Sequence, residues 1–341
     1  MPGPFLSPSE VARQLGVSAK ALRLYELRGL LIPSRTAAGW RAYSPADLAR
    51  AREIVMLRAL GLSLAEVGRV VLKGDISAVR PALAAHQSNL ETQARRLAEQ
   101  IAKVRDLRAE LDSGEALDSD DLAPLMLSAM PTVAFDLPWP WGGERFELTD
   151  IRALNFIVGP LFSGKTRLAR AIAHGYPGGV FVGPERSADD GAAATVQLAA
   201  DTSLRERVDR ALAWLVEEGA NRSPALVALV AALEMDGPQA LVVDMIEQGL
   251  DEPTQQALIT YLRRRNADAP PLFLLTRSSA ILDLAAVGPK ETIILCPANH
   301  APPSYVVPTP GVAGYEAVAT CLASPEVRAR SEGVVAMRAP L

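Results

Sequence analysis

Hydrophobic and polar positions alternate along the first 75 residues in a pattern that predicts several short helices. Apolar residues recur at helical spacing over 11–15, and Ser7 and Glu10 just before them have the spacing of a capping box. Gly16 interrupts the pattern, and Ser18 can cap a second helix. Two short helices joined by a tight turn with glycine are typical of a helix-turn-helix, whose second helix enters the major groove of DNA.

The pattern continues with a hairpin and longer helices. The polar segment 33–43 predicts a short hairpin that can lie beside a DNA groove as a wing, and helices are predicted over 45–59 and 64–71. One long helix is predicted over 79–111, where an apolar residue recurs every seven positions: Leu83, Leu90, Leu97, Val104 and Leu111. This heptad spacing makes the helix a coiled-coil candidate. The second row of the heptad is mostly polar, so the candidate has one apolar row.

From residue 132 the pattern changes to short apolar runs that alternate with helical segments. Two β-rich stretches, 132–137 and 145–149, come first. Strands are then predicted over 153–158, 179–182, 240–243 and 272–275, and helices over 167–174, 202–218, 225–235 and 253–266. Such alternation implies a parallel α/β sheet with a ligand at the carboxyl ends of its strands. The final segment is rich in proline and ends in a helix predicted over 314–330.

One short segment of this second half carries a recognisable chemistry. Residues 159–166 read Gly-Pro-Leu-Phe-Ser-Gly-Lys-Thr, a phosphate-binding loop between a predicted strand and a predicted helix. The backbone around Gly159, Ser163 and Gly164, with the positive end of the helix, is expected to cradle a polyphosphate. Lys165 is expected to reach the terminal phosphates, and the Thr166 hydroxyl to bind Mg²⁺. The predicted ligands are therefore ATP or ADP, with Mg²⁺.

A carboxylate for the same metal ion is predicted at the end of strand 240–243. Asp244 follows the buried pattern Leu-Val-Val, as a Walker B aspartate does. The string Leu-Asp-Glu-Pro at 250–253 also resembles a Walker B motif, but the segment 245–249 before it is not a buried strand. We therefore interpret Asp244 as the metal carboxylate and Asp251 as an interface residue.

Composition narrows the class of protein. At 341 residues, with 49% hydrophobic and 22% charged positions, the chain can form two or three ordinary globular domains. It has no apolar run of transmembrane length and no signal peptide, so a cytoplasmic protein with no membrane partner is expected. The two cysteines, Cys296 and Cys321, fit a reducing compartment better than a disulfide framework.

The net charge of −4 is unevenly distributed along the chain. Residues 1–75 hold 11 Lys/Arg against 6 Asp/Glu, a net charge of +5, whereas the remainder carries −9. A basic first part on an acidic body indicates that the first part meets a polyanion.

Residues 5 to 73 resemble the DNA-binding domain of the MerR family. The resemblance is carried by five strings in order: VARQLGVS at 11–18, LRLYE at 22–26, GLLIP at 29–33, GWRAY at 39–43 and LGLSL at 60–64. It implies DNA contacts from Lys20, Arg23 and Tyr25 on the second helix, and from Arg41 and Tyr43 in the wing. Trp40 stands where the family usually has a tyrosine in the wing. For both Tyr25 and Trp40, the alternative interpretation is that the side chain packs in the hydrophobic core.

The same resemblance has consequences for assembly. It implies that the helix over 79–111 pairs antiparallel with that of a second subunit. The resulting homodimer would bind palindromic double-stranded promoter DNA, with RNA polymerase as the downstream partner. Residues 112–131 contain neither Cys nor His, which argues against thiolate metal sensing in that region.

Residues 130 to 298 resemble the ABC/RecF-like AAA ATPases, with departures from their pattern. Arg277 stands where the switch segment normally has His, and Met245 stands where a catalytic Glu normally follows the Walker B aspartate. Hydrolysis is therefore expected to be slow or absent unless Glu247 or Glu252 substitutes. One of Phe135, Trp139 and Trp141 is an alternative stacking partner for the base, although packing in the core or a turn is the favoured interpretation.

The sequence thus predicts a multi-domain protein, all-α at first and α/β afterwards. The predicted parts are a winged helix-turn-helix over 1–75, a dimerisation helix over 76–112, a linker over 113–130, a P-loop domain over 131–298, and a proline-rich tail with a helix over 299–341. The expected function is transcriptional regulation with ATP as a regulatory ligand. One alternative is an enzyme with a weak ATPase activity that is targeted to DNA and acts in DNA maintenance or defence. The other alternative is a degenerate nucleotide domain that serves only as a scaffold.

Overall fold

The computed structural model describes residues 5–36, 38–112, 132–265 and 269–329. The chain divides into two compact units, of which one runs to Arg105 and includes the stretch 217–219, while the other holds the remaining residues. Each unit has a hydrophobic core of its own. The linker predicted over 113–130 lies outside the described residues.

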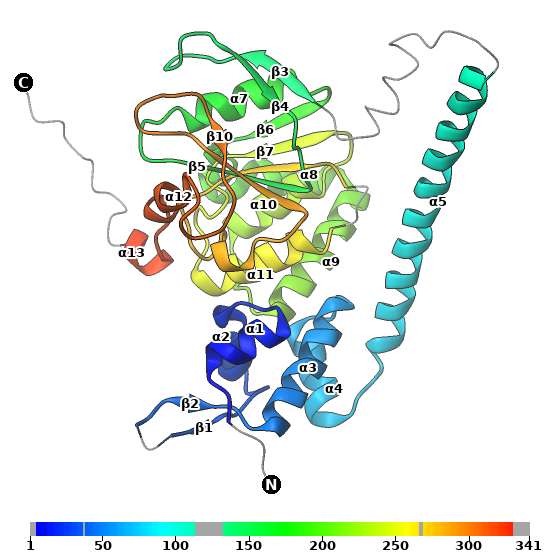
Figure 1. Ribbon diagram of the computed structural model, residues 1–341, viewed down its shortest axis with the longest axis vertical. Coiled ribbons are helices and arrows are strands. Elements are labelled where there is room, and N and C mark those ends of the chain that lie inside the picture. The colour runs from blue at the N-terminus through cyan, green and yellow to red at the C-terminus, as the bar shows by residue number, and fades with distance from the viewer. Residues whose placement is uncertain (1–4, 37, 113–131, 266–268, 330–341) are drawn as a thin grey trace, which may run out of the picture. The chain divides into compact units, whose positions relative to one another are not determined.

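The first unit begins with four short helices and a hairpin, as the hydrophobic pattern predicts (Figure 1). In order, they are α1 (Pro8–Leu15), α2 (Ala19–Leu27), β1 (Ser34–Arg35), β2 (Arg41–Ala42), α3 (Pro45–Ala59) and α4 (Leu64–Lys73). Serine side chains cap all four helices, and the capping box of Ser7 and Glu10 is confirmed. Local sequence alone therefore determines where these helices begin.

The hairpin β1–β2 is antiparallel, with Arg35 opposite Arg41. The core of this unit gathers apolar side chains from all four helices, among them Val11, Leu22, Ile54 and Val67. This shared core sets the orientation of the helix-turn-helix relative to α3 and α4.

Helix α5 (Val79–Asp112) confirms the long helix predicted for this region. The described members of its apolar row, Leu83, Leu90, Leu97 and Val104, are between 43% and 58% exposed. A row of four half-exposed aliphatic side chains on one helix is a surface that a partner helix can cover.

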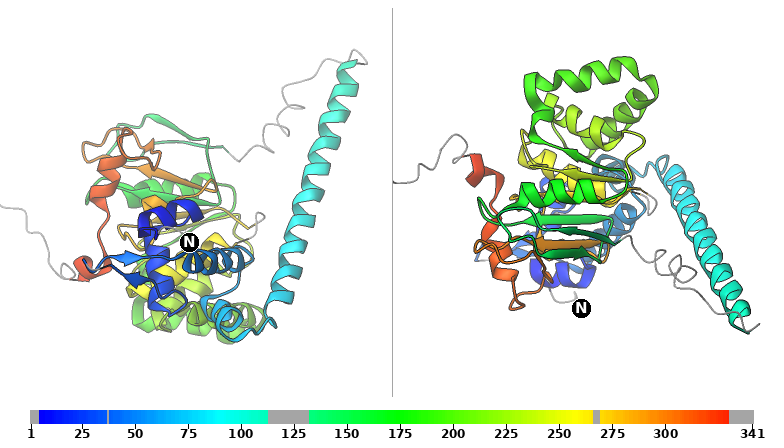
Figure 2. Two further views of the ribbon diagram at one scale, coloured as in Figure 1. Left: turned by 60° about the horizontal axis from the view of Figure 1, so that its bottom comes forward. Right: turned by 90° about the horizontal axis from the view of Figure 1, so that it is seen from above.

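The second unit is built on a six-stranded sheet with helices on both faces (Figures 1 and 2). The strand order is β10 (Ser304–Tyr305), β9 (Glu291–Leu295), β5 (Leu154–Val158), β8 (Leu272–Leu275), β7 (Ala240–Val243) and β6 (Gly179–Val182). All neighbouring pairs are parallel except β10 with β9. The predicted parallel α/β architecture is confirmed.

Two cores lie on the two faces of this sheet, because successive side chains of a strand point to opposite sides. On one face α7 (Lys165–Gly175) and the antiparallel pair β3 (Val133–Asp136) and β4 (Arg145–Leu148) pack against Ile157, Val242 and Phe273. On the other face lie four helices: α8 (Ala192–Ala200), α9 (Thr202–Glu218), α10 (Pro224–Leu233) and α11 (Glu252–Arg263). Short 3-10 segments, η1 (Pro184–Gly191) and η2 (Leu284–Ala286), connect some of these elements.

The C-terminal segment differs from its prediction. The predicted single helix is two helices, α12 (Tyr315–Cys321) and α13 (Pro325–Ala329), separated where Ala323 pairs with Ser278. Val306 and Val318 of this segment are buried in the core of the second unit. Strand β9 also lies in this part of the chain, and the sequence analysis did not assign it. The described helices include none that combines the length and the apolar character needed to cross a membrane.

Candidate functional site

The phosphate-binding loop connects β5 to α7, as the motif requires. Its backbone leaves no room for side chains at two glycines: a Cβ at Gly159 would lie 2.4 Å from the Cys296 carbonyl oxygen, and one at Gly164 would lie 2.7 Å from the Trp141 ring. Gly164 also has a φ of 89° at the start of α7. These two glycines let the loop pack closely against Cys296 and Trp141. The loop leads directly into α7, whose first amides have no partners within the helix.

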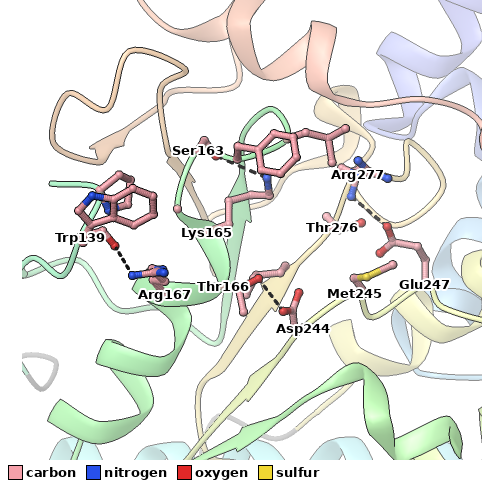
Figure 3. A pocket seen from close by; sticks show the side chains of 15 residues that line it. Trp139, Ser163, Lys165, Thr166, Arg167, Asp244, Met245, Glu247, Thr276 and Arg277 are labelled. Atoms are coloured by element: carbon pink, nitrogen blue, oxygen red, sulfur yellow. Dashed lines mark hydrogen bonds between the residues drawn. The ribbon is translucent and has the colours of Figure 1, made fainter. Parts of the chain in front are cut away.

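Beside the loop lies a pocket of about 630 Å³, here called the nucleotide pocket. Its lining includes Ser163, Gly164, Lys165 and Thr166 from the loop, Asp244, Met245 and Glu247 after β7, Thr276 and Arg277 after β8, and Trp139 before β4. Figure 3 shows Lys165, Thr166 and Asp244 in the middle of this pocket, with Trp139 on one side and Glu247 and Arg277 on the other.

Thr166 and Asp244 meet at the base of the nucleotide pocket. The Thr166 hydroxyl donates to Oδ2 of Asp244 at 2.8 Å. Thr166 lies on α7, after β5, and Asp244 follows β7, and β8 lies between these two strands in the sheet. Asp244 is 6% exposed and follows the fully buried strand β7. A hydroxyl and a carboxylate side by side are oxygen donors of the kind that Mg²⁺ prefers.

Lys165 is the cation at the centre of the nucleotide pocket. Its Nζ donates to the Pro160 carbonyl oxygen at 2.5 Å and lies 3.5 Å from Ser163 Oγ. Burial lowers the pKa of Lys165, and the nearby charge of Arg277 acts in the same direction. Two cations close together in a partly buried site favour an anionic ligand.

The turn after β7 is held by a residue that sequence reasoning missed. Arg186 of η1 donates to the main-chain oxygens of Asp244 at 2.7 Å and Met245 at 2.6 Å. Met245 has a φ of 48°, an unusual conformation for a residue with a side chain. Arg186 therefore positions the carboxylate of Asp244 through the backbone, and its place in a polar 3-10 segment gave no signal in the sequence.

The two candidate catalytic carboxylates lie in different surroundings. Glu247 lines the nucleotide pocket, is 3% exposed and accepts a hydrogen bond from the Arg277 amide at 3.0 Å. Glu252 begins α11 and accepts from Gln256 Nε2 at 3.1 Å, and it is not among the residues that line the pocket. Asp251 is the N-cap of α11, where it accepts from the Thr254 amide at 3.0 Å and from the Asn221 side chain at 2.5 Å.

The three aromatic candidates for stacking on the nucleotide base differ in their exposure and position. Trp141 is 5% exposed in the core, and Phe135 packs edge-on against Phe146. Trp139 is 69% exposed and lines the nucleotide pocket, with the Arg167 guanidinium 4.4 Å from its ring centre. Of the three, only Trp139 presents a ring to a ligand in the pocket.

In the first unit, the residues predicted to contact DNA separate into surface and core groups. Lys20 and Arg23 are exposed on α2, and Arg41 is partly exposed on the hairpin with its guanidinium 3.1 Å from Glu26. Tyr43 is fully buried and donates its hydroxyl to Glu26, so the predicted DNA contact of its side chain does not hold. Tyr25 is 6% exposed in the same core, which favours the core alternative. Trp40, by contrast, is 74% exposed.

Among the described residues, no cluster of three or more His, Cys, Asp or Glu side chains is arranged to hold a metal ion on its own. The pair Thr166 and Asp244 is thus a partial donor set, which suits an ion that a phosphate also holds.

Comparisons with known proteins bear mainly on the N-terminal part of the chain. The family signature described as "MerR HTH family regulatory protein" matches residues 6–73. The HTH-type transcriptional activator TipA of Streptomyces coelicolor is 36% identical over 142 residues, which are 41% of this chain and 51% of that protein. The chain therefore spans about half the length of this curated relative.

Two solved structures extend the comparison. HiNmlR, described as a MerR family regulator lacking the sensor domain and bound to promoter DNA, is 23% identical, with a TM-score of 0.26 over 37% of this chain and 97% of its own. An ATP-binding cassette of an ABC transporter in its ADP conformation is 13% identical, with a TM-score of 0.36 over 60% of this chain and 98% of its own. From the match of the family signature, the chain carries a MerR-type helix-turn-helix domain at its N-terminus.

Proposed function

We propose that this protein is a DNA-binding transcriptional regulator whose second unit binds Mg·ATP, or ADP, as a regulatory ligand and hydrolyses it slowly or not at all. The observation that carries the proposal is the hydrogen bond of 2.8 Å between Thr166 and Asp244, beside a glycine-containing loop that connects β5 to α7. The next residue is Met245, which cannot act as a base.

The residues of the nucleotide pocket fit a triphosphate with its metal ion. A Cβ at Gly159 or Gly164 would clash with neighbouring atoms and disrupt the loop. The N-terminal amides of α7 would donate to the anions of a polyphosphate bound there. Lys165 supplies a positive charge, while Thr166 and Asp244 supply oxygen donors. When bound, Mg²⁺ would neutralise phosphate charge that these side chains do not reach.

Slow hydrolysis follows from the groups near Met245. Loss of a general base typically lowers a rate by about 10²–10⁴. Besides Asp244, Glu247 is the carboxylate among the described residues that lines the nucleotide pocket, and it accepts a hydrogen bond from the Arg277 amide. We infer that Glu247 mainly supports the loop that carries Arg277.

The first unit supplies the DNA-binding function. Lys20 and Arg23 on α2 and Arg41 in the hairpin are the side chains that we propose for phosphate or base contacts. The net charge of +5 over residues 1–75 would supply the long-range attraction. Because the first unit carries a MerR-type helix-turn-helix, we propose promoter DNA as the target and RNA polymerase as the downstream partner. The apolar row of α5 would pair two subunits on a palindromic site, in the cytoplasm.

The decisive experiment measures promoter binding and transcription with and without Mg·ATP. We compare wild type, Lys165→Ala and, as a matched control, Lys290→Ala, since Lys290 is exposed and lies outside the pocket. Wild type and Lys290→Ala should bind Mg·ATP and change their promoter affinity by about 5- to 150-fold, the usual range of allosteric coupling. Lys165→Ala should lose both effects. An identical response of all three proteins, with and without nucleotide, would sink the regulatory proposal.

A second candidate, a DNA-targeted ATPase, is favoured by one observation: the buried carboxylate of Glu247 lines the nucleotide pocket. This candidate predicts steady turnover that DNA stimulates and that Glu247→Gln abolishes. If neither ATP nor ADP raises the melting temperature, the scaffold alternative replaces both candidates.

A further inference from the structure

A second cavity, of about 450 Å³, lies against the phosphate loop and is lined on another side by the C-terminal segment. Gly159, Pro160 and Leu161 belong to the loop, and Ala317, Thr320 and Cys321 belong to α12. We propose that this effector cavity binds a small apolar molecule that carries one anionic group, and that Arg277 couples its occupancy to the nucleotide pocket.

The lining determines the class of ligand. Leu161, Leu295, Pro297 and Ala298 make most of the wall apolar, and the volume lies within the range of about 300–1,000 Å³ usual for small-ligand sites. Of the described residues that line the cavity, Arg277 is the one with a charge. An apolar body would be buried against the aliphatic wall, and a carboxylate would form charge-assisted hydrogen bonds with the guanidinium.

Arg277 is also the physical link between the two cavities, because it lines both. Its backbone is fixed on two sides: the amide donates to Glu247 at 3.0 Å, and the carbonyl accepts from Ala323, just after α12, at 2.9 Å. The side chain can therefore serve an anion on either side, while the backbone stays in place.

Sharing one guanidinium makes the coupling negative. A carboxylate in the effector cavity draws the charge of Arg277 away from a phosphate in the nucleotide pocket, and each ligand weakens the other by the same factor. This regulatory step rests on the proposed nucleotide function, whereas binding of the effector does not. The C-terminal segment, which had no functional assignment from its sequence, forms one wall of the effector cavity.

The test of binding uses naphthalene-2-carboxylate as the probe and its neutral analogue, naphthalene-2-carboxamide, in isothermal titration calorimetry. The carboxylate should bind with one site per chain, and the carboxamide should bind at least about tenfold more weakly, because it cannot form the ionic contact. Arg277→Met should remove this preference, and Arg277→Lys should partly restore it. Equal affinity of the two compounds for wild type would overturn the proposal.

A cavity-filling variant distinguishes this site from others. Ala317 and Ala313 are both exposed, but only Ala317 belongs to the lining of the effector cavity. Ala317→Trp therefore adds a ring at the cavity, whereas the matched Ala313→Trp adds the same ring outside it. Thermal melting first checks that both variants are folded. Ala317→Trp should then lose at least about tenfold in affinity for the probe, and Ala313→Trp should keep the wild-type affinity. Undiminished binding to Ala317→Trp would refute the location.

A final titration separates the effector proposal from the proposed function. As the Mg·ATP concentration rises, the affinity of the probe should fall only to a finite plateau, as expected for two coupled sites. An affinity that keeps falling without a plateau means that the probe competes for the nucleotide pocket, and this would contradict the proposal. No dependence on Mg·ATP, in a protein that binds both ligands, would refute the coupling through Arg277. If Mg·ATP does not bind at all, the nucleotide function fails, while the carboxamide and Ala317→Trp comparisons still decide the effector site.

Discussion

Lys165 illustrates how a functional residue is held at a cost to stability. Its ammonium group is largely removed from water and lies near the charge of Arg277, and burial is the larger cause of its lowered pKa. A lysine whose pKa is lower in the folded state than in the unfolded state destabilises the fold at neutral pH. The carboxylate of Asp244 partly offsets these effects, and a bound polyphosphate would add further counter-charge.

Lys165→Met should therefore raise the stability of the nucleotide-free protein. At pH 7 we expect a higher melting temperature, with a gain of roughly 0.5–2 kcal/mol, the usual size for a stabilising substitution. The gain should shrink as pH rises through the folded pKa of Lys165 towards its ordinary value of 10.5, because the wild-type ammonium then loses its proton in the folded state. Calorimetric melts over this alkaline range check the sign.

The control for this substitution is Lys290→Met, which removes an exposed ammonium and should change stability little. Mg·ATP should raise the melting temperature of the control and of wild type but not of Lys165→Met. A variant that melts below wild type at pH 7 without nucleotide would contradict the view that burial of the charge dominates.

Single residues differ in how far the sequence predicts them. Thr166 and Asp244 were predicted because each follows a strand of the same parallel sheet, and parallel strands end at one edge. The predicted DNA contact of Tyr43 failed because its side chain is buried in the core that the first four helices share, and this tertiary packing cannot be seen in the short string that carries the residue. The role of Arg186 depends on a loop returning to the end of β7, and its polar surroundings resemble any exposed segment.

At the scale of elements, Asp251 shows how one side chain starts a helix. Sequence reasoning rejected it as a metal carboxylate, and the structure makes it the N-cap of α11. Burial raises the pKa of Asp251, but the hydrogen bonds from Thr254 and Asn221 outweigh burial and hold this pKa below 3.8. The predicted interface role stays a prediction beside this structural one.

Asp251→Ala should lower the free energy of unfolding by about 1 kcal/mol, the typical loss for an N-cap. Asp251→Asn should retain most of the wild-type stability at pH 7, because asparagine caps equally well. Since the folded pKa is the lower one, the carboxylate stabilises above pH 3.8 and loses this effect as pH falls through its folded pKa. Urea titrations at neutral and acidic pH should show a smaller acid dependence for Asp251→Asn, and an equal dependence would argue against the capping carboxylate.

Elements in the C-terminal segment were the hardest to predict. Residues 315–329 were predicted as one helix, yet they contain a local break, because Pro325 is the first residue of α13 and the Ser324 hydroxyl accepts from the Val327 amide. A tertiary backbone pairing lies at the same break, where Ser279 donates to the Ala323 carbonyl and Ala323 donates to the Arg277 carbonyl. Strand β9 went unassigned although its five residues are all buried, since a short apolar run beside a proline-rich segment has no periodicity of its own.

At the scale of the whole chain, the order of strands in the second unit was beyond sequence reasoning. Strand β8 comes after β7 in the chain but lies between β5 and β7, so Asp244 reaches Thr166 across an intervening strand. Alternating helices and strands predict a parallel sheet without fixing this order. The class of fold was therefore predictable, and the route by which the two motifs meet was not.

Self-association is the property of the whole chain that the DNA-binding proposal requires. The described apolar row of α5 leaves Leu83, Leu90, Leu97 and Val104 about half exposed, which is unfavourable for a helix that remains single. A second copy of the same helix would cover this row and place two basic first units on one palindrome.

Leu90→Lys with Leu97→Lys should convert a dimer into monomers. Each leucine buried between helices contributes about 1.5–3 kcal/mol, so the dimer dissociation constant should rise by about a hundredfold or more. The matched control, Ser88→Lys with Glu99→Lys, places the same lysines on the opposite side of α5 and should leave the dimer intact. Sedimentation equilibrium measures the mass, and promoter binding should weaken in parallel for the first pair only. A first pair that remains dimeric would show that another surface joins the subunits.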